Sequence, residues 1–329
     1  MILSVGIDIG TSTTQLIFSR LTIENRASSY TVPRIDIVDK EVIYRSKIYF
    51  TPLRSATEID AEAVKRIVRE EYQAAGMTPE MLRTGAVIIT GETARKENAN
   101  EVLEALSDLA GDFVVATAGP DLESVLSARG AGTDALSKEK RTAIANVDIG
   151  GGTTDIAVIT LGSMACSTSL KLAGDALTAA VQRFVQEKYQ IVVGENMAER
   201  IKIALGSVAP LPVPLSFEVS GKDLATASPR TIALSDTDTR EAFQPITEKL
   251  VSAVMGILEV TPPELGADIM RQGMLLTGGG ALLRGFADRI TRATRLPVYV
   301  DSDPLTTVLR GAGITLDDPE KYRDLLIEC

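Results

Sequence analysis

Short runs of apolar and β-branched residues, separated by turn residues, recur along the first part of the chain. This pattern is typical of buried strands. Residues 2–9 and 15–18 predict two strands joined by a turn of Gly, Thr and Ser, and alternation over 35–52 predicts a second group of strands. Further buried strands are predicted at 86–91 and 113–119, so this part of the chain is rich in strands.

Helical spacing of apolar residues occurs between these strands. Residues 60–75 fit an amphipathic helix that Gly76 ends, and 98–109 predict a second helix. The stretch 130–140 is rich in Gly, Ala, Ser and Lys and indicates a surface connection. The alternation of strands and helices predicts an α/β fold.

The second part of the chain opens in the same way, because residues 143–162 again predict strand, turn and strand. Helices are predicted at 177–188, 196–205 and 239–260, short strands at 215–221 and 231–235, and a strand followed by a helix at both 274–286 and 297–316. An internal duplication of this kind predicts two similar domains that face each other across a cleft.

One phrase occurs twice: GIDIGTSTTQLIF at 6–18 and VDIGGGTTDIAV at 147–158, which align when Asp8 is placed on Asp148. A strand that ends in Asp and runs into glycine and hydroxyl residues places a carboxylate beside backbone N–H groups that can bind phosphate. The carboxylate can also hold a hydrated Mg²⁺ that neutralises phosphate charge. Two such hairpins predict a clamp on a triphosphate.

A third glycine cluster, LLTGGGALLRG at 275–285, has no Asp and suits close approach to a base or sugar. A tight hairpin without a ligand is the alternative for any one of these turns, and the occurrence of three in this order argues against it. The chain has no Walker sequence, and no G-x-G-x-x-G follows its first strand, which excludes the P-loop and Rossmann nucleotide sites.

Composition removes other classes of function. A net charge of −10, 4% aromatic residues and no Trp argue against nucleic acid as a partner. The absence of His excludes Ser-His-Asp catalysis and His-ligated metal. The two cysteines form no C-x-x-C pair, the first residues lack the features of a signal peptide, and no apolar run reaches the about 18 residues needed to span a bilayer. We therefore expect a cytoplasmic protein.

The two phosphate hairpins and the third glycine cluster resemble the phosphate-1, phosphate-2 and adenosine motifs of the actin, heat-shock chaperone and sugar-kinase superfamily. The resemblance covers the whole chain. It implies a two-lobed α/β fold of duplicated ribonuclease-H-like domains around a nucleotide cleft, with ATP or ADP and Mg²⁺ as ligands.

The two halves resemble different families within the superfamily. Residues 1–158, with VIYRSKIYFTPL and GDFVVATAGPDLESVLSARGAG, resemble EutA, the reactivating factor of cobalamin-dependent ethanolamine ammonia-lyase. Residues 159–329, with GENMAERIKIALGSVAP and GMLLTGGGALLRGF, resemble MreB, the bacterial actin. The seam falls inside the phosphate-2 hairpin, and the sequence leaves open whether the mosaic is natural or engineered.

The resemblance also implies domain limits. The first lobe is expected at 1–145 and the second at 146–315, with a small inserted subdomain at about 185–245. A C-terminal helix at 316–329 is expected to pack back on the first lobe.

Residue roles follow from the matched motifs. Asp8 and Asp148 are expected to hold Mg²⁺ and to act in catalysis, while backbone donors of the two turns bind phosphate. Glu195, Glu199 and Lys202 lie on a helix that approaches ribose and adenine in the family; an ion pair in solvent is the alternative for Glu199 and Lys202. The nucleotide-binding set is Gly10, Thr11, Ser12, Thr13, Thr14, Gly150, Gly151, Gly152, Thr153, Thr154, Glu195, Glu199, Lys202, Gly278, Gly279, Gly280 and Ala281.

The water-positioning residue is the weakest part of the match. MreB proteins have E-E-P after the corresponding strand, and this chain has A-G-P at 118–120, so that Gly119 replaces the second glutamate. Asp121 or Glu123 could substitute, although a helix cap is the alternative role for Asp121. We expect nucleotide binding with slow ATP hydrolysis at most.

Three functions therefore compete. The first is an actin-like ATP- or ADP-binding protein, possessing at most a slow Mg²⁺-dependent ATPase. The second is a EutA-type chaperone whose partner is ethanolamine ammonia-lyase, and the third is an MreB-like filament whose partner is a second copy of the chain. A sugar kinase is a weaker alternative, because nothing in the sequence marks a sugar site. Direct membrane binding is not expected, since the first lobe has no amphipathic N-terminal helix.

Overall fold

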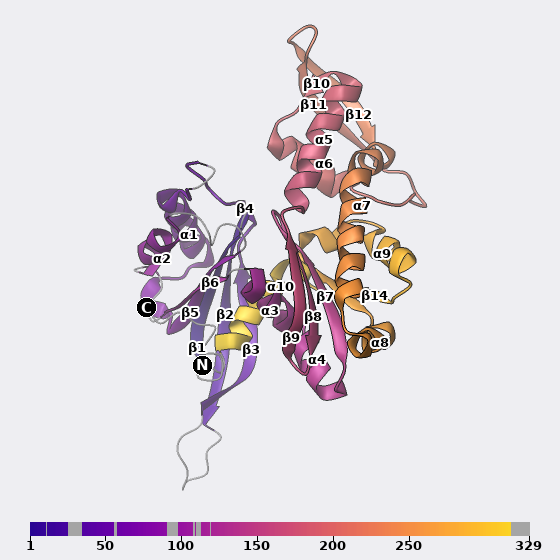
Figure 1. Ribbon diagram of the computed structural model, residues 1–329. Helices are drawn as coiled ribbons and strands as arrows, with labels where there is room; N and C mark the ends of the chain where they lie inside the picture. The colour runs from indigo at the N-terminus through magenta and orange to yellow at the C-terminus, as the bar shows by residue number, and fades with distance from the viewer. Residues whose placement is uncertain are drawn as a thin grey trace. The chain divides into compact units, whose positions relative to one another are not determined.

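The computed structural model describes residues 1–10, 12–25, 35–55, 58–90, 98–107, 109, 113–118 and 120–316. The chain divides into two compact units, each with its own sheet (Figure 1). The first unit holds Met1–Gly130 and the chain from Val308 onward, and the second holds Ala131–Thr307.

The first unit is built on a mixed sheet with the strand order β3-β2-β1-β5-β6. The strands are β1 (Ile2–Ile9), β2 (Thr13–Asn25), β3 (Ile35–Arg45), β5 (Thr84–Thr90) and β6 (Phe113–Ala118), and the short β4 (Tyr49–Phe50) pairs with β2. Strands β1, β2 and β3 are antiparallel neighbours, whereas β5 runs parallel to both β1 and β6. Alternate side chains of β1 are buried, among them Ile7 and Ile9.

The first unit also contains several helical segments. They are α1 (Ala61–Ala75), the 3-10 turn η1 (Pro79–Met81), α2 (Ala99–Ser107), α3 (Pro120–Gly130) and α10 (Thr307–Leu316). The prediction that Gly76 ends α1 is confirmed, because Gly76 adopts the left-handed conformation at φ 67°. Ala312 of α10 packs in a small core with Ala86 and Leu126. Apart from Leu316, the helix expected at 316–329 lies outside the described residues.

The second unit repeats this sheet. Its strand order is β14-β13-β7-β8-β9, in which β7, β8 and β9 are antiparallel and β13 runs parallel to β7 and β14. The strands are β7 (Ala143–Ile149), β8 (Thr154–Thr160), β9 (Ser163–Leu170), β13 (Met274–Thr277) and β14 (Val298–Val300). Each unit thus has three antiparallel strands in chain order and then two parallel strands beside the first, so the predicted duplication is confirmed in the topology.

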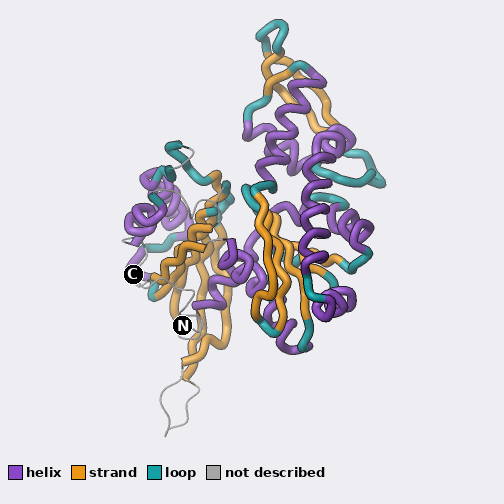
Figure 2. The backbone as a smooth tube through the Cα atoms, in the orientation of Figure 1, coloured by secondary structure: helices purple, strands orange, loops and turns teal. Residues whose placement is uncertain are grey.

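A long segment lies between β9 and β13 of the second unit. It contains α5 (Gly174–Tyr189), β10 (Ile191–Val192), α6 (Glu195–Leu205), β11 (Ser216–Asp223), β12 (Pro229–Ser235), α7 (Asp236–Val260) and α8 (Pro263–Gln272). Strands β10, β11 and β12 form a separate sheet, which α7 connects to the larger one (Figure 2). The remaining elements are α9 (Phe286–Thr294) and the 3-10 turns η3 (Gly279–Leu282) and η4 (Pro304–Thr306).

The prediction of a surface connection at 130–140 was wrong, because α4 (Thr133–Lys140) occupies most of it. The helix has tertiary support that composition does not reveal. Ser137 is fully buried, and its hydroxyl accepts a hydrogen bond from the Gly162 amide at 2.9 Å. Asp134 and Lys138 face each other one turn apart at 3.9 Å.

Candidate functional site

The first repeated hairpin joins β1 to β2 through a tight turn. The Gly10 amide donates a hydrogen bond to the Thr13 carbonyl at 2.8 Å. Asp8 lies opposite Gln15 and Ile9 opposite Thr14 in the antiparallel register. Among the predicted residues of this turn, Ser12 lies between these strands and Thr11 lies outside the described residues.

The second hairpin joins β7 to β8 with the same geometry. The Gly150 amide donates to the Thr153 carbonyl at 2.9 Å. Asp148 lies opposite Asp155 and Ile149 opposite Thr154. The duplication therefore extends to the register and to the hydrogen bond that closes each turn, and the side chain of Asp148 is buried.

The start of α5 packs against the second turn. The Gly174 amide donates to the Gly150 carbonyl at 3.1 Å, and the Asp175 amide donates to the Gly151 carbonyl at 2.8 Å. In the described part of the chain, the amides of Gly151, Gly152 and Thr153 form no backbone–backbone hydrogen bond. Backbone donors grouped beside a helix N-terminus are the arrangement that binds phosphate.

Two predicted residues of α6 reach the same place. The Lys202 Nζ lies 2.6 Å from the Glu199 Oε2 and donates to the Gly174 carbonyl at 3.2 Å. The Thr178 hydroxyl of α5 donates to the same Glu199 oxygen at 2.6 Å. The Glu199–Lys202 pair is therefore held against the start of α5, whereas Glu195 is exposed in the first turn of α6.

The third glycine cluster packs on the end of β7. A Cβ on Gly278 would lie 2.4 Å from both the Asp148 Oδ1 and the Ile149 carbonyl oxygen, and Gly278 has φ +74°. A Cβ on Gly280 would lie 2.2 Å from the Ile149 Cγ2. These two glycines allow the cluster to lie directly against β7. The cluster also includes Gly279 and the buried Ala281.

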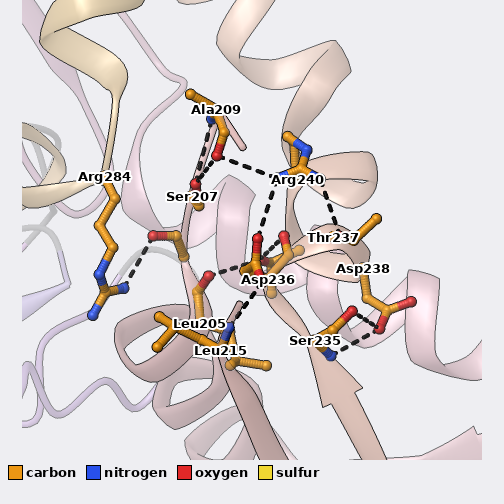
Figure 3. Close-up of polar contacts among 12 residues, drawn as sticks. Leu205, Ser207, Ala209, Leu215, Ser235, Asp236, Thr237, Asp238, Arg240 and Arg284 are labelled. Atoms are coloured by element: carbon orange, nitrogen blue, oxygen red, sulfur yellow. Dashed lines mark hydrogen bonds and ion pairs between the residues drawn. The ribbon is translucent and has the colours of Figure 1, made fainter. Parts of the chain in front are cut away.

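A polar network that sequence analysis missed connects α6 to this cluster (Figure 3). Arg284, which follows the glycine cluster, donates to the Gly206 carbonyl at 3.1 Å, and the Val208 amide donates to the Arg284 carbonyl at 2.9 Å. Arg240 of α7 donates to the Ala209 carbonyl and to Asp236, both at 3.2 Å. The network fixes the end of α6, and hence Lys202, relative to Gly278–Ala281. Only the three-dimensional fold brings these donors and carbonyls together, so no local sequence pattern marks them.

The expected water-positioning residues lie in the first unit. Glu123 is half-buried on α3, the helix that follows β6. Asp121 lies on the same helix, but its side chain lies outside the described part, as does Gly119. The proposed role of either carboxylate stays a prediction.

No group of three or more metal-ligating side chains occurs among the described residues. A magnesium ion bound with a nucleotide takes one or two carboxylates and completes its shell with phosphate oxygens and water. Asp148 could supply one such carboxylate, because it lies near the end of β7, beside the turn. None of the helices in the described ranges has the length and apolar character needed to cross a bilayer.

Two family models match the chain. The model described as "Ethanolamine utilisation protein EutA" matches residues 1–206, and the one described as "Cell division protein FtsA" matches residues 145–315. The chain belongs to both families, EutA in its first part and FtsA in its second. The matches overlap over residues 145–206, so the phosphate-2 turn, α5 and α6 are common to both.

Curated relatives divide in the same way. The ethanolamine ammonia-lyase reactivase EutA of Salmonella typhimurium is 43% identical over 189 residues, which cover 57% of this chain and 40% of the relative. The cell shape-determining protein MreB of Escherichia coli is 43% identical over 195 residues, covering 59% of this chain and 55% of the relative. The expected likeness to EutA and to MreB is confirmed, and the chain spans about half the length of these relatives.

Solved structures establish the fold over nearly the whole chain. MreB 5 of Spiroplasma citri, bound to AMPPNP, aligns with a TM-score of 0.72 at 24% identity and covers 98% of both chains. The ethanolamine utilisation protein EutJ of Carboxydothermus hydrogenoformans aligns with a TM-score of 0.57 at 20% identity, covering 94% of this chain and 89% of its own. The predicted two-lobed actin-like fold is confirmed.

Proposed function

We propose that this chain is an actin-like protein that binds ATP or ADP through its phosphate turns and its third glycine cluster. The observation that carries the proposal is the phosphate-2 turn, in which three backbone donors lie beside the start of α5 and the Glu199–Lys202 pair. The same hydrogen bond closes the phosphate-1 turn. Structures of MreB 5 bound to AMPPNP and to ADP support the choice of ligand.

Each group has a distinct task in this proposal. The turn amides bind phosphate oxygens, and the Lys202 ammonium adds positive charge beside them. Asp8 and Asp148 would hold Mg²⁺, which neutralises phosphate charge when it is bound. The cluster at Gly278–Ala281 and the side chains of α6 would bind the nucleoside.

Hydrolysis is proposed to be slow. The family position of the second glutamate is Gly119, which has no side chain to orient a water molecule. Asp121 and Glu123 on α3 are the carboxylates closest to it in sequence, and they are the candidates for that task. Orientation of the attacking water supplies a large part of the rate in phosphoryl transfer.

Thermal unfolding tests the proposal. A ligand that binds only the folded state stabilises it by about 2.7 kcal/mol at a concentration of 100 times its Kd. We expect ATP and ADP with Mg²⁺ to raise the melting temperature, and Mg²⁺ with inorganic phosphate to raise it less. Equal melting temperatures with and without both nucleotides would refute nucleotide binding.

A second candidate function is reactivation of ethanolamine ammonia-lyase, which the 43% identity to the EutA reactivase favours. The match covers 40% of that protein, so the likeness concerns less than half of it. Co-elution of this chain with ethanolamine ammonia-lyase in size-exclusion chromatography, with and without ATP, tests this candidate. Separate elution under both conditions would eliminate it.

A further inference from the structure

Thr51, which follows β4, makes three hydrogen bonds to the phosphate-1 hairpin. Its amide donates to the Ser12 carbonyl at 2.9 Å, and its hydroxyl donates to the Gly10 carbonyl at 2.8 Å. The same hydroxyl lies 3.0 Å from the hydroxyl of Thr14. Thr51 is 7% exposed and Thr14 is fully buried, so these bonds are shielded from water.

The second unit supports the equivalent atoms in another way. There the Gly150 carbonyl accepts from the Gly174 amide at 3.1 Å, and the Thr154 hydroxyl donates to the Leu172 carbonyl at 2.8 Å. Both partners are backbone groups at, or just before, the start of α5. In the first unit, one side chain, Thr51, contacts the corresponding carbonyl and threonine hydroxyl.

The strand β4, which precedes Thr51, is held by a clamp that consists of Tyr44, Tyr49 and Glu71. Tyr49 lies opposite Thr14 in the β2–β4 pairing, and its hydroxyl donates to Glu71 of α1. The hydroxyl of Tyr44 donates to the same carboxylate at 2.6 Å. Glu71 is buried, and its carboxylate accepts hydrogen bonds from both phenol hydroxyls. The clamp therefore anchors the strand that presents Thr51 to the turn.

We propose that Thr51 is a positioning residue of the phosphate-1 turn, and that its hydroxyl sets the affinity of this turn for nucleotide phosphates. This inference rests on the proposed nucleotide binding. A binding turn has to be held within about 0.5 Å of its productive geometry by the residues behind it. Removing the hydroxyl leaves the Gly10 carbonyl and the Thr14 hydroxyl without this buried partner, and the turn relaxes.

The test compares Thr51→Val, which loses the hydroxyl and keeps the shape and the amide, with Thr51→Ser, which keeps the hydroxyl. ATP with Mg²⁺ and adenosine are titrated into each variant, because adenosine carries no phosphate. We expect Thr51→Val to weaken ATP binding about tenfold, as the loss of buried hydrogen bonds predicts, and to leave adenosine binding unchanged. Thr51→Ser should bind ATP as the wild type does.

Two further variants keep the test decisive. Tyr49→Phe breaks the clamp without touching Thr51, and we expect about a threefold loss of ATP affinity even if Thr51→Val fails to fold. Thr231→Val on β12 removes an exposed hydroxyl that pairs with Ser220 at 2.8 Å, and it should change neither ligand's affinity.

The outcomes distinguish a failure of the role of Thr51 from a failure of the proposed nucleotide binding. A wild type that binds neither ATP nor adenosine overturns both. A wild type that binds ATP, with Thr51→Val and Tyr49→Phe binding it equally well, overturns the role of Thr51 alone. Equal weakening of ATP and adenosine would mean that Thr51 supports the whole fold rather than the phosphate turn.

Discussion

Gly278 occupies a position that no other residue fits without strain. Its φ of +74° disfavours a side chain, and a Cβ there would lie 2.4 Å from the Asp148 Oδ1. Gly279, its neighbour, has room, because its Cβ would lie 3.4 Å from the Leu305 Cδ2. Gly279 can therefore accept a Cβ atom, whereas Gly278 cannot.

We expect Gly278→Ala to lower the free energy of unfolding by about 2 kcal/mol or more, from the left-handed backbone and the clash together. Gly279→Ala is the matched control and should change it by less than about 0.5 kcal/mol. Urea denaturation of both variants measures the difference. Equal stability of the two would contradict the packing of this cluster on β7.

The phosphate turns were predictable from sequence because each is a local pattern: Asp at the end of a strand, then glycine and threonine. Thr51 and Arg284 were not, because each contacts backbone groups that only the fold brings near. The Thr51 hydroxyl reaches the Gly10 carbonyl from 41 residues away, and the Arg284 guanidinium reaches the Gly206 carbonyl from 78 residues away. Such positioning residues can be identified only when the three-dimensional fold is known.

At the scale of elements, the β11–β12 hairpin carries an acid-sensitive contact. The amide of Thr226, the guanidinium of Arg230 and the amide of Ala225 all donate to the Asp223 carboxylate. These donors, the Thr226 amide first, lower the pKa of Asp223 from 3.8 to about 2.

Because the pKa of Asp223 is lower in the folded state, its contribution to stability is complete above the ordinary value of 3.8 and is lost as the pH falls towards 2. We expect Asp223→Asn to lower the melting temperature at pH 7 and to lower it less at pH 2.5. Glu218→Gln, an exposed change on the same strand, serves as the control. A deficit in Asp223→Asn that is the same at both pH values would show that the charge is not responsible.

Element boundaries differed from prediction where a cap or tertiary contact decided them. Helix α7 begins at Asp236, three residues before the predicted start, because the Asp238 carboxylate accepts hydrogen bonds from the amide and hydroxyl of Ser235 at 2.8 Å each. Strand β9 was not predicted, since its mostly small polar residues lack the apolar character of β7 and β8. The strongly apolar strands were identified correctly.

At the scale of the whole molecule, the chain has two similar units and matches two families. The EutA match ends at residue 206 and the FtsA match begins at 145, so the seam predicted at 158–159 lies inside the shared segment. That segment holds the phosphate-2 turn, whose chemistry both families share in this proposal. A join between the EutA-like and FtsA-like parts at this point would therefore be compatible with nucleotide binding, whether it arose by natural selection or by design.

Calorimetric titration of ATP with Mg²⁺ tests the central claim most directly. The wild type is compared with Asp8→Asn and Asp148→Asn, and with Asp288→Asn, an exposed control on α9. We predict saturable binding that weakens when Mg²⁺ is removed, weakens at least about tenfold in Asp8→Asn and in Asp148→Asn, and persists in the control. Wild-type binding that neither Mg²⁺ nor the two aspartates affect would contradict the assigned site, and no binding at all would contradict the function.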